Sequence, residues 1–315
     1  MRILVVGAGA LGGYFGGRLA EAGRDVTFLV RPWRAEEIAR HGLRIESMHG
    51  NAHLRPRTAL AGGDPGGPYD LVLLAVKAHA LDGAMDDLAP ALGPGTAVLP
   101  VLNGMRHLDR LAERFGAERV LGGVAQIPAS LGPEGRVRHL GRVHGMTFGE
   151  LGGGMSERVR ATAALCEGAR FDARASEAIV QEMWEKWVML AALAGMTCLM
   201  RASVGDILAA PGGREALLSL LAECRAVAEA AGHAPRPAAV EAATAMLTAE
   251  GSPLTASMLR DIEGGGSTEV EHVLGDMAER AGIPTPLLRL ARCHVAAYEA
   301  RRAGTRPCLA ALRSE

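Results

Sequence analysis

The 315-residue sequence is poor in aromatic side chains, which make up 3% of it, and its net charge is only −1. With so few rings, the cores must be filled mainly by aliphatic side chains, in a chain that is 49% hydrophobic. A nearly neutral chain lacks the long-range attraction by which proteins gather nucleic acid or anionic membranes. We therefore expect a small metabolite as the partner, and neither nucleic acid nor a membrane.

Cysteine is also scarce and scattered, and long apolar runs are missing. The cysteines form no CxxC pair, which excludes a disulfide framework and a zinc finger and predicts reduced thiols without a metal site. The longest uncharged apolar run, 187–200, is too short to cross a bilayer. The N-terminus enters a strand directly and has no signal-peptide pattern. These features predict a cytoplasmic protein with five free cysteines, namely Cys166, Cys198, Cys224, Cys293 and Cys308.

The first 30 residues contain a complete β-α-β pattern. Arg2 to Val6 is a short run rich in β-branched residues, and the sequence GAGALG follows it at once. Leu11 to Ala22 has helical periodicity and stops at Gly23, and Asp25 to Val30 resembles a second strand. A strand, a tight glycine turn, a helix and a strand in this order indicate two parallel strands joined by a helix.

The rest of the chain divides into two parts with different patterns of predicted secondary structure. Strand-like runs at 70–76, 96–102 and 119–125 alternate with helical segments, which predicts a mainly parallel sheet covered on both faces. Alternation in 136–151 predicts a few antiparallel strands that close this sheet. We expect an α/β nucleotide-binding domain at 1–175 and an all-helical domain at 176–315 for substrate and catalysis. Two domains are also what a chain of this length commonly forms. The helical segments of the second part are Glu177–Met200, Gly213–Ala231, Ala238–Glu250, Ser267–Ala281 and Pro286–Ala303.

The glycine turn has the form that binds a dinucleotide. Gly7 permits the tight turn after the strand, Gly9 leaves room for the pyrophosphate, and Gly12 lets the helix approach the sheet. The N–H groups at the helix start then face the phosphates. A glycine turn without a ligand is the alternative, which the position between a strand and a helix disfavours.

The end of the second strand indicates which dinucleotide is bound. NAD sites usually place an acid there for the ribose 2′-hydroxyl. Here the strand ends in Arg31, Arg34 follows, and the first acid is Glu36. Two arginines suit a 2′-phosphate, so we expect NADP(H). The alternative is that both are ordinary surface charges.

The whole chain resembles the ketopantoate reductases (2-dehydropantoate 2-reductases). The likeness rests on the opening GAGALGGYFGGRLAEAG, on Arg31, on AVKAHAL around Lys77 and on LNGM around Asn103. It continues with EMWEKW around Lys186 and with ASMLRDIEGGGSTEVEH from Ala256. The resemblance implies an N-terminal Rossmann domain, an all-helical C-terminal domain, NADPH as cofactor and an active site in the cleft between the domains.

The resemblance also implies residue roles. Lys186 corresponds to the catalytic lysine that donates a proton to the carbonyl oxygen, and Glu269 to the acid that holds the reacting groups. Ser257 and Asn103 correspond to residues that contact the substrate, and Asn103 and Lys77 to polar residues near the nicotinamide ribose. The expected cofactor-binding set is Gly7, Ala8, Gly9, Ala10, Leu11, Gly12, Arg31, Lys77 and Asn103.

Taken from the residues alone, each of these roles has an alternative. Lys186 could pair with Glu182 one helical turn away. Glu269 could be an acid that opposes a helix dipole, although Thr268 and Glu271 form a plausible capping box without it. The Asn103-Gly104 pair could be a simple turn, and Trp184 and Trp187 could be core or interdomain anchors.

The sequence departs from the family at two positions after the catalytic lysine. Leu190 and Ala194 stand where the family carries asparagines that contact the substrate, one and two helical turns from Lys186. Loss of such amides affects substrate choice more than reaction type. The function is then 2-dehydropantoate reduction, reduction of a less polar ketone or imine by a paralogue, or NADP sensing without catalysis. The uncharged helix 187–200 could also serve an interdomain contact or a homodimer contact.

Overall fold

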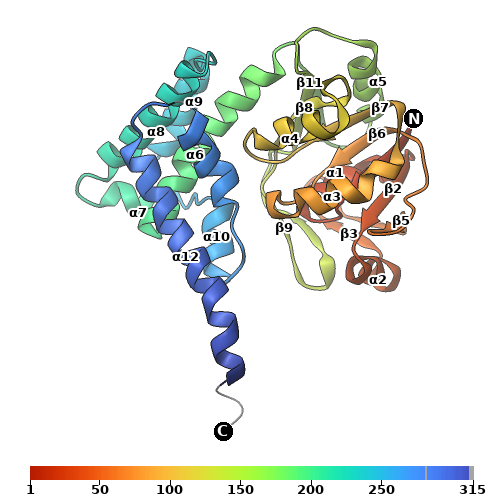
Figure 1. The fold of residues 1–315 in the computed structure, drawn as a ribbon, viewed down its shortest axis with the longest axis horizontal. Helices are drawn as coiled ribbons and strands as arrows, with labels where there is room; N and C mark the ends of the chain where they lie inside the picture. Colours follow the sequence, from red (N-terminus) through yellow and green to blue (C-terminus); the bar gives the residue numbers. More distant parts are fainter. Residues whose placement is uncertain (281, 312–315) are drawn as a thin grey trace. The chain divides into compact units, whose positions relative to one another are not determined.

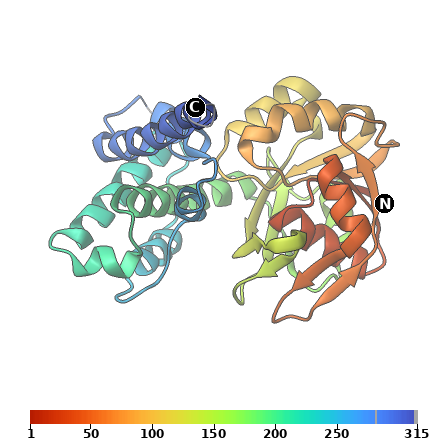
Figure 2. The ribbon, with the colours of Figure 1, turned by 90° about the horizontal axis from the view of Figure 1, so that it is seen from below.

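The structure, a computed structural model, describes residues 1–280 and 282–311, with side chains only as far as residue 304. The chain forms two compact units. The first unit consists of Met1–Leu102 and Arg106–Met183, and the second of Asn103–Met105 and the chain from Trp184 onward. Figures 1 and 2 show all strands in the first unit and only helices in the second.

The first unit is built on a five-stranded sheet in the order β5-β2-β1-β6-β7. Every pairing in this sheet is parallel, and the strands are apolar because helices cover them, which confirms the predicted parallel sheet. The chain reverses its direction of strand addition beside β1, where sheets of this kind bind ligands at the carboxyl ends of the strands. The strands are β1 (Arg2–Val6), β2 (Asp25–Val30), β5 (Arg57–Leu60), β6 (Tyr69–Leu74) and β7 (Leu92–Pro100).

Two smaller sheets complete the first unit, where the sequence suggested strands closing the main sheet. One has the order β4-β3-β10-β9 and the other β12-β11-β8. The predicted closure is therefore correct only in part. A parallel bridge between Val98 and Val120 joins the residue before β8 to the edge of the main sheet, and β11 pairs antiparallel with β8, whereas β10 pairs antiparallel with β9 in a separate sheet. Their strands are β3 (Leu43–Glu46), β4 (Ala52–Leu54), β8 (Leu121–Gln126), β9 (Ala129–Leu131), β10 (Val137–His139), β11 (Gly145–Glu150) and β12 (Asp172–Ala175).

Helix α1 (Ala10–Glu21) lies between the parallel sheet and the β3–β10 sheet. Glycines on both of its faces make this close packing possible. A Cβ at Gly16 would lie 2.8 Å from Val5 on one side, and a Cβ at Gly13 would lie 2.7 Å from Val137 on the other. The remaining helices of this unit are α2 (Pro32–His41), α3 (Leu81–Leu88), α4 (Arg106–Phe115) and α5 (Glu157–Cys166).

The second unit is helical, as the sequence predicts. Its core surrounds α6 (Ile179–Met200), the long helix that begins in the first unit. Helix α12 (Pro286–Ala311) starts with a proline at its first position, and the Glu223 carboxylate of a neighbouring helix caps it by accepting from the Leu287 and Leu288 N–H groups. The other helices are α7 (Val204–Ala209), α8 (Gly213–Ala230), α9 (Pro237–Leu247), α10 (Ser257–Glu263) and α11 (Asp276–Arg280).

Several sequence expectations meet their test here. The helix expected from Ser267 starts only at Val270 and continues through a π-helical turn, Glu271–Gly275, into α11, while its expected end at Ala281 lies outside the described residues. Cys166, Cys198, Cys224 and Cys293 are free, and the side chain of Cys308 lies outside the described part. No helix in the described residues has the length and apolarity needed to cross a membrane.

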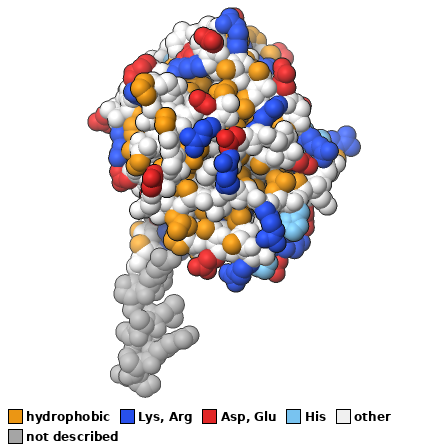
Figure 3. All heavy atoms as spheres, turned by 90° about the vertical axis from the view of Figure 1, so that its right-hand side faces the viewer, with side chains coloured by type: hydrophobic (Ala, Val, Ile, Leu, Met, Phe, Trp, Pro, Cys, Tyr) orange, Lys and Arg blue, Asp and Glu red, His pale blue; other side chains and the backbone are white. Residues whose placement is uncertain are grey.

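The run 187–200 is a buried helix, as expected from its composition. Trp187, Val188 and every residue from Ala191 to Cys198 are buried inside the second unit. These side chains are therefore covered within the chain, so this part of the run presents no exposed surface of its own to a second copy. Over the face drawn in Figure 3, basic and acidic side chains are interspersed, in keeping with the small net charge.

Candidate active site

The glycine turn of the first unit joins β1 to α1 at the carboxyl end of the parallel sheet. Gly7 has φ +94°, a conformation that favours glycine, and its missing Cβ would lie 3.1 Å from the Ala75 carbonyl oxygen. A Cβ on Gly12 would overlap the Gly7 carbonyl oxygen. Both residues therefore serve the close approach of the turn, the helix and the end of β6, as the motif predicts.

The same turn fits a dinucleotide. Gly9 is the N-cap of α1 and supplies no side chain to its first N–H groups, and the first turn of the helix holds no acid. A Cβ on Gly9 would meet nothing within 4 Å, so open space lies beside these donors. Free N–H groups at a helix N-terminus, without a competing carboxylate, suit a pyrophosphate.

The two arginines after β2 differ sharply in their surroundings. Arg31 is exposed at the end of the strand, where a 2′-phosphate is expected. Arg34 is 3% exposed, and its Nε donates to the Ala8 carbonyl oxygen at 2.9 Å while Nη1 pairs with Glu37 at 3.0 Å. Arg34 therefore fixes α2 to the glycine turn, and the proposed pairing of both arginines with one phosphate is not what the structure shows.

Lys77 follows β6, the strand next to β1. It is exposed and precedes a short 3-10 turn, Ala78–Ala80. Since Ala75 contacts the glycine turn, as described above, the chain brings Lys77 to the same edge of the sheet. The first unit thus collects Gly7 to Gly12, Arg31 and Lys77 at one edge.

In the second unit, Lys186 and Asn103 meet although they lie far apart in the sequence. Asn103 belongs to the short segment Asn103–Met105 that is part of this unit. Lys186 Nζ donates a hydrogen bond to Asn103 Oδ1 at 3.1 Å, and both side chains are half-buried. The amide oxygen orients the ammonium group without neutralising its charge.

The pKa of Lys186 is lowered to about 8, because burial removes its ammonium group from water, whereas the nearby Glu269 carboxylate acts in the opposite direction and raises it. A lysine with a pKa near neutral pH can both hold and release a proton under working conditions. The structure therefore brings together Lys186, Asn103 and Glu269, three residues to which the resemblance assigns roles.

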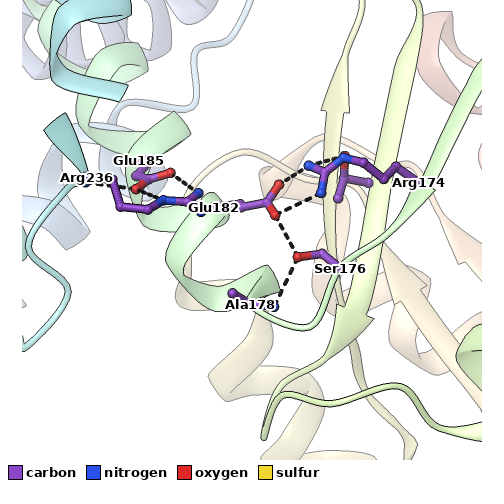
Figure 4. Close-up of polar contacts among 7 residues, drawn as sticks. Arg174, Ser176, Ala178, Glu182, Glu185 and Arg236 are labelled. Carbon is purple, nitrogen blue, oxygen red and sulfur yellow. Dashed lines mark hydrogen bonds and ion pairs between the residues drawn. The ribbon is translucent and has the colours of Figure 1, made fainter. Parts of the chain in front are cut away.

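The acidic residues that flank Lys186 on α6 are bound to other partners, as Figure 4 shows. The Glu182 carboxylate accepts from Ser176 Oγ at 2.6 Å and forms an ion pair with Arg174. The Glu185 carboxylate binds Arg236 through two hydrogen bonds of 2.7 and 2.5 Å. Glu182 is thus held by Arg174 and Ser176 while Lys186 donates to Asn103, so the alternative of a simple Glu182–Lys186 pair is not supported.

Of the other expected substrate residues, Leu190 and Ser257 are accessible and Ala194 is not. Leu190, one turn after Lys186, is half-buried, and Ser257 is exposed at the start of α10. Ala194, two turns after Lys186, is 1% exposed and packs in the core of the unit. Only the first of the two positions that depart from the family can therefore offer surface to a ligand.

Two features near Glu269 could not be foreseen. The expected Thr268–Glu271 capping box is wrong, because the Glu271 carboxylate pairs with Arg292 and the Thr268 N–H donates to Glu299. The Trp187 indole, expected only as an anchor, donates to the Val273 carbonyl oxygen at 2.9 Å. This second contact depends on the π-helical turn, for which the sequence carries no local signal.

Comparison with known proteins agrees with this arrangement. Residues 3–153 match the family described as Ketopantoate reductase PanE/ApbA, and residues 178–299 match its C-terminal part. A Bacillus subtilis protein named "Uncharacterized oxidoreductase YkpB" is 37% identical over 96% of this chain and 100% of its own length. A 2-dehydropantoate 2-reductase of Mesorhizobium japonicum is 30% identical over 91% of this chain and 94% of its own.

Solved structures give the same result. The 2-dehydropantoate 2-reductase of Geobacter metallireducens has 31% identity and a TM-score of 0.85, with coverage of 94% of this chain and 99% of that one. A D-mandelate dehydrogenase with NADH and anilino(oxo)acetate shares the fold, with a TM-score of 0.87 at 21% identity and coverage of 96% and 100%. The chain therefore belongs to the ketopantoate reductase family of NAD(P)-dependent oxidoreductases, as its motifs predict.

Proposed function

We propose that this protein reduces the ketone of a 2-oxo acid with NADPH, and that 2-dehydropantoate, reduced to pantoate, is its substrate. The observation that carries the proposal is the environment of the Lys186 ammonium group. This group is half-buried, donates a hydrogen bond to Asn103 and lies close enough to Glu269 for the carboxylate to raise its pKa. The names of the relatives support the substrate. Arg31 at the end of β2 supports NADPH over NADH.

The chemistry of the site follows from these residues. NADPH, when bound, supplies the hydride that adds to the carbonyl carbon. As negative charge develops on the carbonyl oxygen, Lys186 stabilises it and transfers a proton to it, which gives a hydroxyl group and a neutral amine. Asn103 orients the ammonium group of Lys186. Glu269 favours the charged form of Lys186 and holds the substrate in place. Solvent then reprotonates the amine, whose pKa of about 8 permits this near neutral pH.

A second candidate is a less polar ketone or imine, and Leu190 favours it. This residue lies one turn after Lys186 on α6 and offers a half-buried apolar side chain where an amide is found in the family. A site without that amide gains little from a hydroxyl group on the substrate. The reaction type would be the same in both cases.

The purified full-length protein provides the test, by the loss of NADPH absorbance with 2-dehydropantoate, with a panel of branched 2-oxo acids and with apolar ketones. We expect turnover of 2-dehydropantoate with NADPH and much slower turnover with NADH. Turnover of apolar ketones alone would favour the second candidate. Binding of NADPH without turnover of any carbonyl compound would reject both and leave an NADP sensor.

A further inference from the structure

The segment that carries Glu269 contains an unusual backbone element. A π-helical turn, Glu271–Gly275, begins two residues after Glu269 and lies within the second unit. Single π-helical turns are rare, are found mostly inside α-helices and often occur at functional sites, because their wider ring shifts the backbone hydrogen bonds.

The backbone of Val273 binds partners on both sides of the proposed site. Its carbonyl oxygen accepts the Trp187 indole N–H at 2.9 Å, and its N–H donates to the Glu269 carbonyl oxygen at 2.9 Å. Trp187 directly follows Lys186 on α6, and it is 1% exposed while Val273 is 2% exposed. The backbone of one buried residue thus connects the helix turn of Lys186 to the segment that carries Glu269.

The neighbouring residue of the same turn contacts the third member of the site. A Cβ on Gly104 would lie 2.6 Å from the His272 carbonyl oxygen, so the Asn103-Gly104 backbone packs directly on this turn. Asn103, in turn, accepts the hydrogen bond from Lys186. The elements that carry Lys186, Asn103 and Glu269 therefore all converge on residues 272 and 273.

We propose that Trp187 is a positioning residue for the reaction: its bond to Val273 sets the separation between Lys186 and Glu269. This inference rests on the proposed roles of those two residues. Without the indole N–H, the buried Val273 carbonyl oxygen would lose this hydrogen bond, and we expect the backbone to shift in response. Because the Val273 N–H is bonded to the Glu269 carbonyl oxygen, the shift would displace the Glu269 carboxylate relative to Lys186.

Trp187→Phe removes the N–H and keeps most of the ring, and Trp184→Phe is its matched control. Trp184 is also buried on α6, at 3% exposure, and its contacts are ring contacts with Trp187 and with His233 at 5.3 Å. We expect kcat for carbonyl reduction to fall about tenfold in Trp187→Phe with KM for NADPH unchanged, and to stay within about twofold in Trp184→Phe. Equal losses in the two variants would reduce Trp187 to a packing residue and overturn the proposal.

A double-mutant cycle with Glu269→Gln separates positioning from packing. If Trp187 acts through Glu269, Trp187→Phe costs little more once the carboxylate is absent, so the two losses do not multiply. The same fold loss in both backgrounds contradicts the inference. Lys186→Met distinguishes a failure of the proposed function from a failure of the role of Trp187. If Lys186→Met abolishes turnover while Trp187→Phe changes nothing, the proposed function stands and the role of Trp187 is rejected.

A spectroscopic measurement covers the case in which Trp187→Phe does not fold. The chain contains three tryptophans, so its 15N indole spectrum has three N–H signals, which Trp33→Phe and Trp184→Phe assign. Glu269→Gln should move the Trp187 signal and leave the Trp33 signal in place. An unmoved Trp187 signal would show that Trp187 is not coupled to the Glu269 carboxylate and would overturn the proposal, whatever the activity.

Discussion

At the residue scale, the proposed role of Lys186 makes the reaction depend on the protonation of this side chain. The folded protein holds the pKa of Lys186 at about 8, so the ammonium form predominates below this pH and the neutral amine above it. Since carbonyl reduction consumes a proton from Lys186, kcat for reduction should be constant at lower pH and fall above about pH 8. Lys186→Met should lower kcat at least about 100-fold at all pH values. The measurement is a pH profile of NADPH-dependent reduction under substrate saturation.

Glu269→Gln tests whether the Glu269 carboxylate influences the pKa of Lys186. The Glu269 carboxylate raises the pKa of Lys186 against the larger effect of burial. Removing the negative charge should therefore move the falling limb of the profile to lower pH. A limb that stays in place or moves upward would show that Glu269 does not act on the ionisation of Lys186.

Arg31 should select the cofactor, as an arginine at this strand end is expected to do. Arg31→Ala should raise KM for NADPH about 10- to 100-fold, the loss typical of a charge-assisted hydrogen bond, and leave KM for NADH nearly unchanged. Arg40→Ala, which changes an exposed arginine in the last turn of the following helix α2, is the control and should change neither value. An equal rise in both KM values would mean that Arg31 does not contact the 2′-phosphate.

At the element scale, two glycines of the β1–α1 turn should serve different purposes, Gly12 the folding of the first unit and Gly9 the binding of the cofactor. A methyl group on Gly9 meets open space, whereas one on Gly12 overlaps the Gly7 carbonyl oxygen. Gly9→Ala should keep the thermal midpoint and weaken NADPH binding, because its methyl group enters the pyrophosphate space. Gly12→Ala should destabilise the first unit by about 1–3 kcal/mol. Thermal unfolding and a fluorescence titration with NADPH measure the two effects, and tight NADPH binding by Gly9→Ala would exclude the proposed phosphate position.

Helix α6 offers a test of the substrate. Leu190→Asn restores an amide one turn after Lys186, and we expect it to raise kcat/KM for 2-dehydropantoate about tenfold, as a new hydrogen bond to the substrate hydroxyl would. Leu190→Ala, which removes the leucine without adding an amide, is the control. No gain in Leu190→Asn would mean that Leu190 does not explain the substrate preference. Ala194→Asn is unsuitable as a companion variant, because the alanine is 1% exposed and an asparagine would enter the core.

The sequence predicts those elements whose pattern is local. The β1–α1–β2 unit, the parallel strands and the buried run in α6 follow from the periodicity of neighbouring residues. The short strands β4, β9 and β10 have three residues each, too few for a period, and their pairing is decided by distant segments. The same limit applies at the site: the sequence offered Lys186 a partner four residues away, and the folded chain gives it one 83 residues away.

At the scale of the whole molecule, the residues proposed to bind the cofactor and those proposed to transfer the proton belong to different units. The glycine turn, Arg31 and Lys77 belong to the first unit, and Lys186 and Glu269 to the second. The segment Asn103–Met105 is the exception, because both of its flanking segments belong to the first unit while it packs with the second. A carboxamide from the segment after β7 thus contacts Lys186 of the second unit, which no division of the sequence at a single boundary predicts.

The two units should also differ in their response to acid, because the first contains a cluster of three histidines. The rings of His49 and His144 stack with centroids 3.7 Å apart, and His139 lies 5.6 Å from His144. Burial is the main cause that lowers the pKa values of His139 and His144, and the neighbouring His49 and Arg18 lower them further, whereas Asp172 partly opposes this effect at His144.

The direction of the pH effect follows from these shifts. Since the folded pKa values lie below the ordinary value of 6.5, the unfolded chain binds more protons as the pH falls below 6.5. Stability of the first unit should therefore be full above this pH and decrease toward the folded pKa values. Urea unfolding at about pH 7.5 and about pH 5.5, with hydrogen exchange of β10 and β11 to identify the first unit, should show a lower midpoint in acid.

Two histidine variants test whether the cluster causes this difference. His144→Gln, which retains an amide for Tyr14, should reduce the difference, and His53→Gln, which changes an exposed histidine outside the cluster, should not. Equal acid sensitivity in both variants would assign the effect to carboxylates elsewhere and not to the stacked histidines.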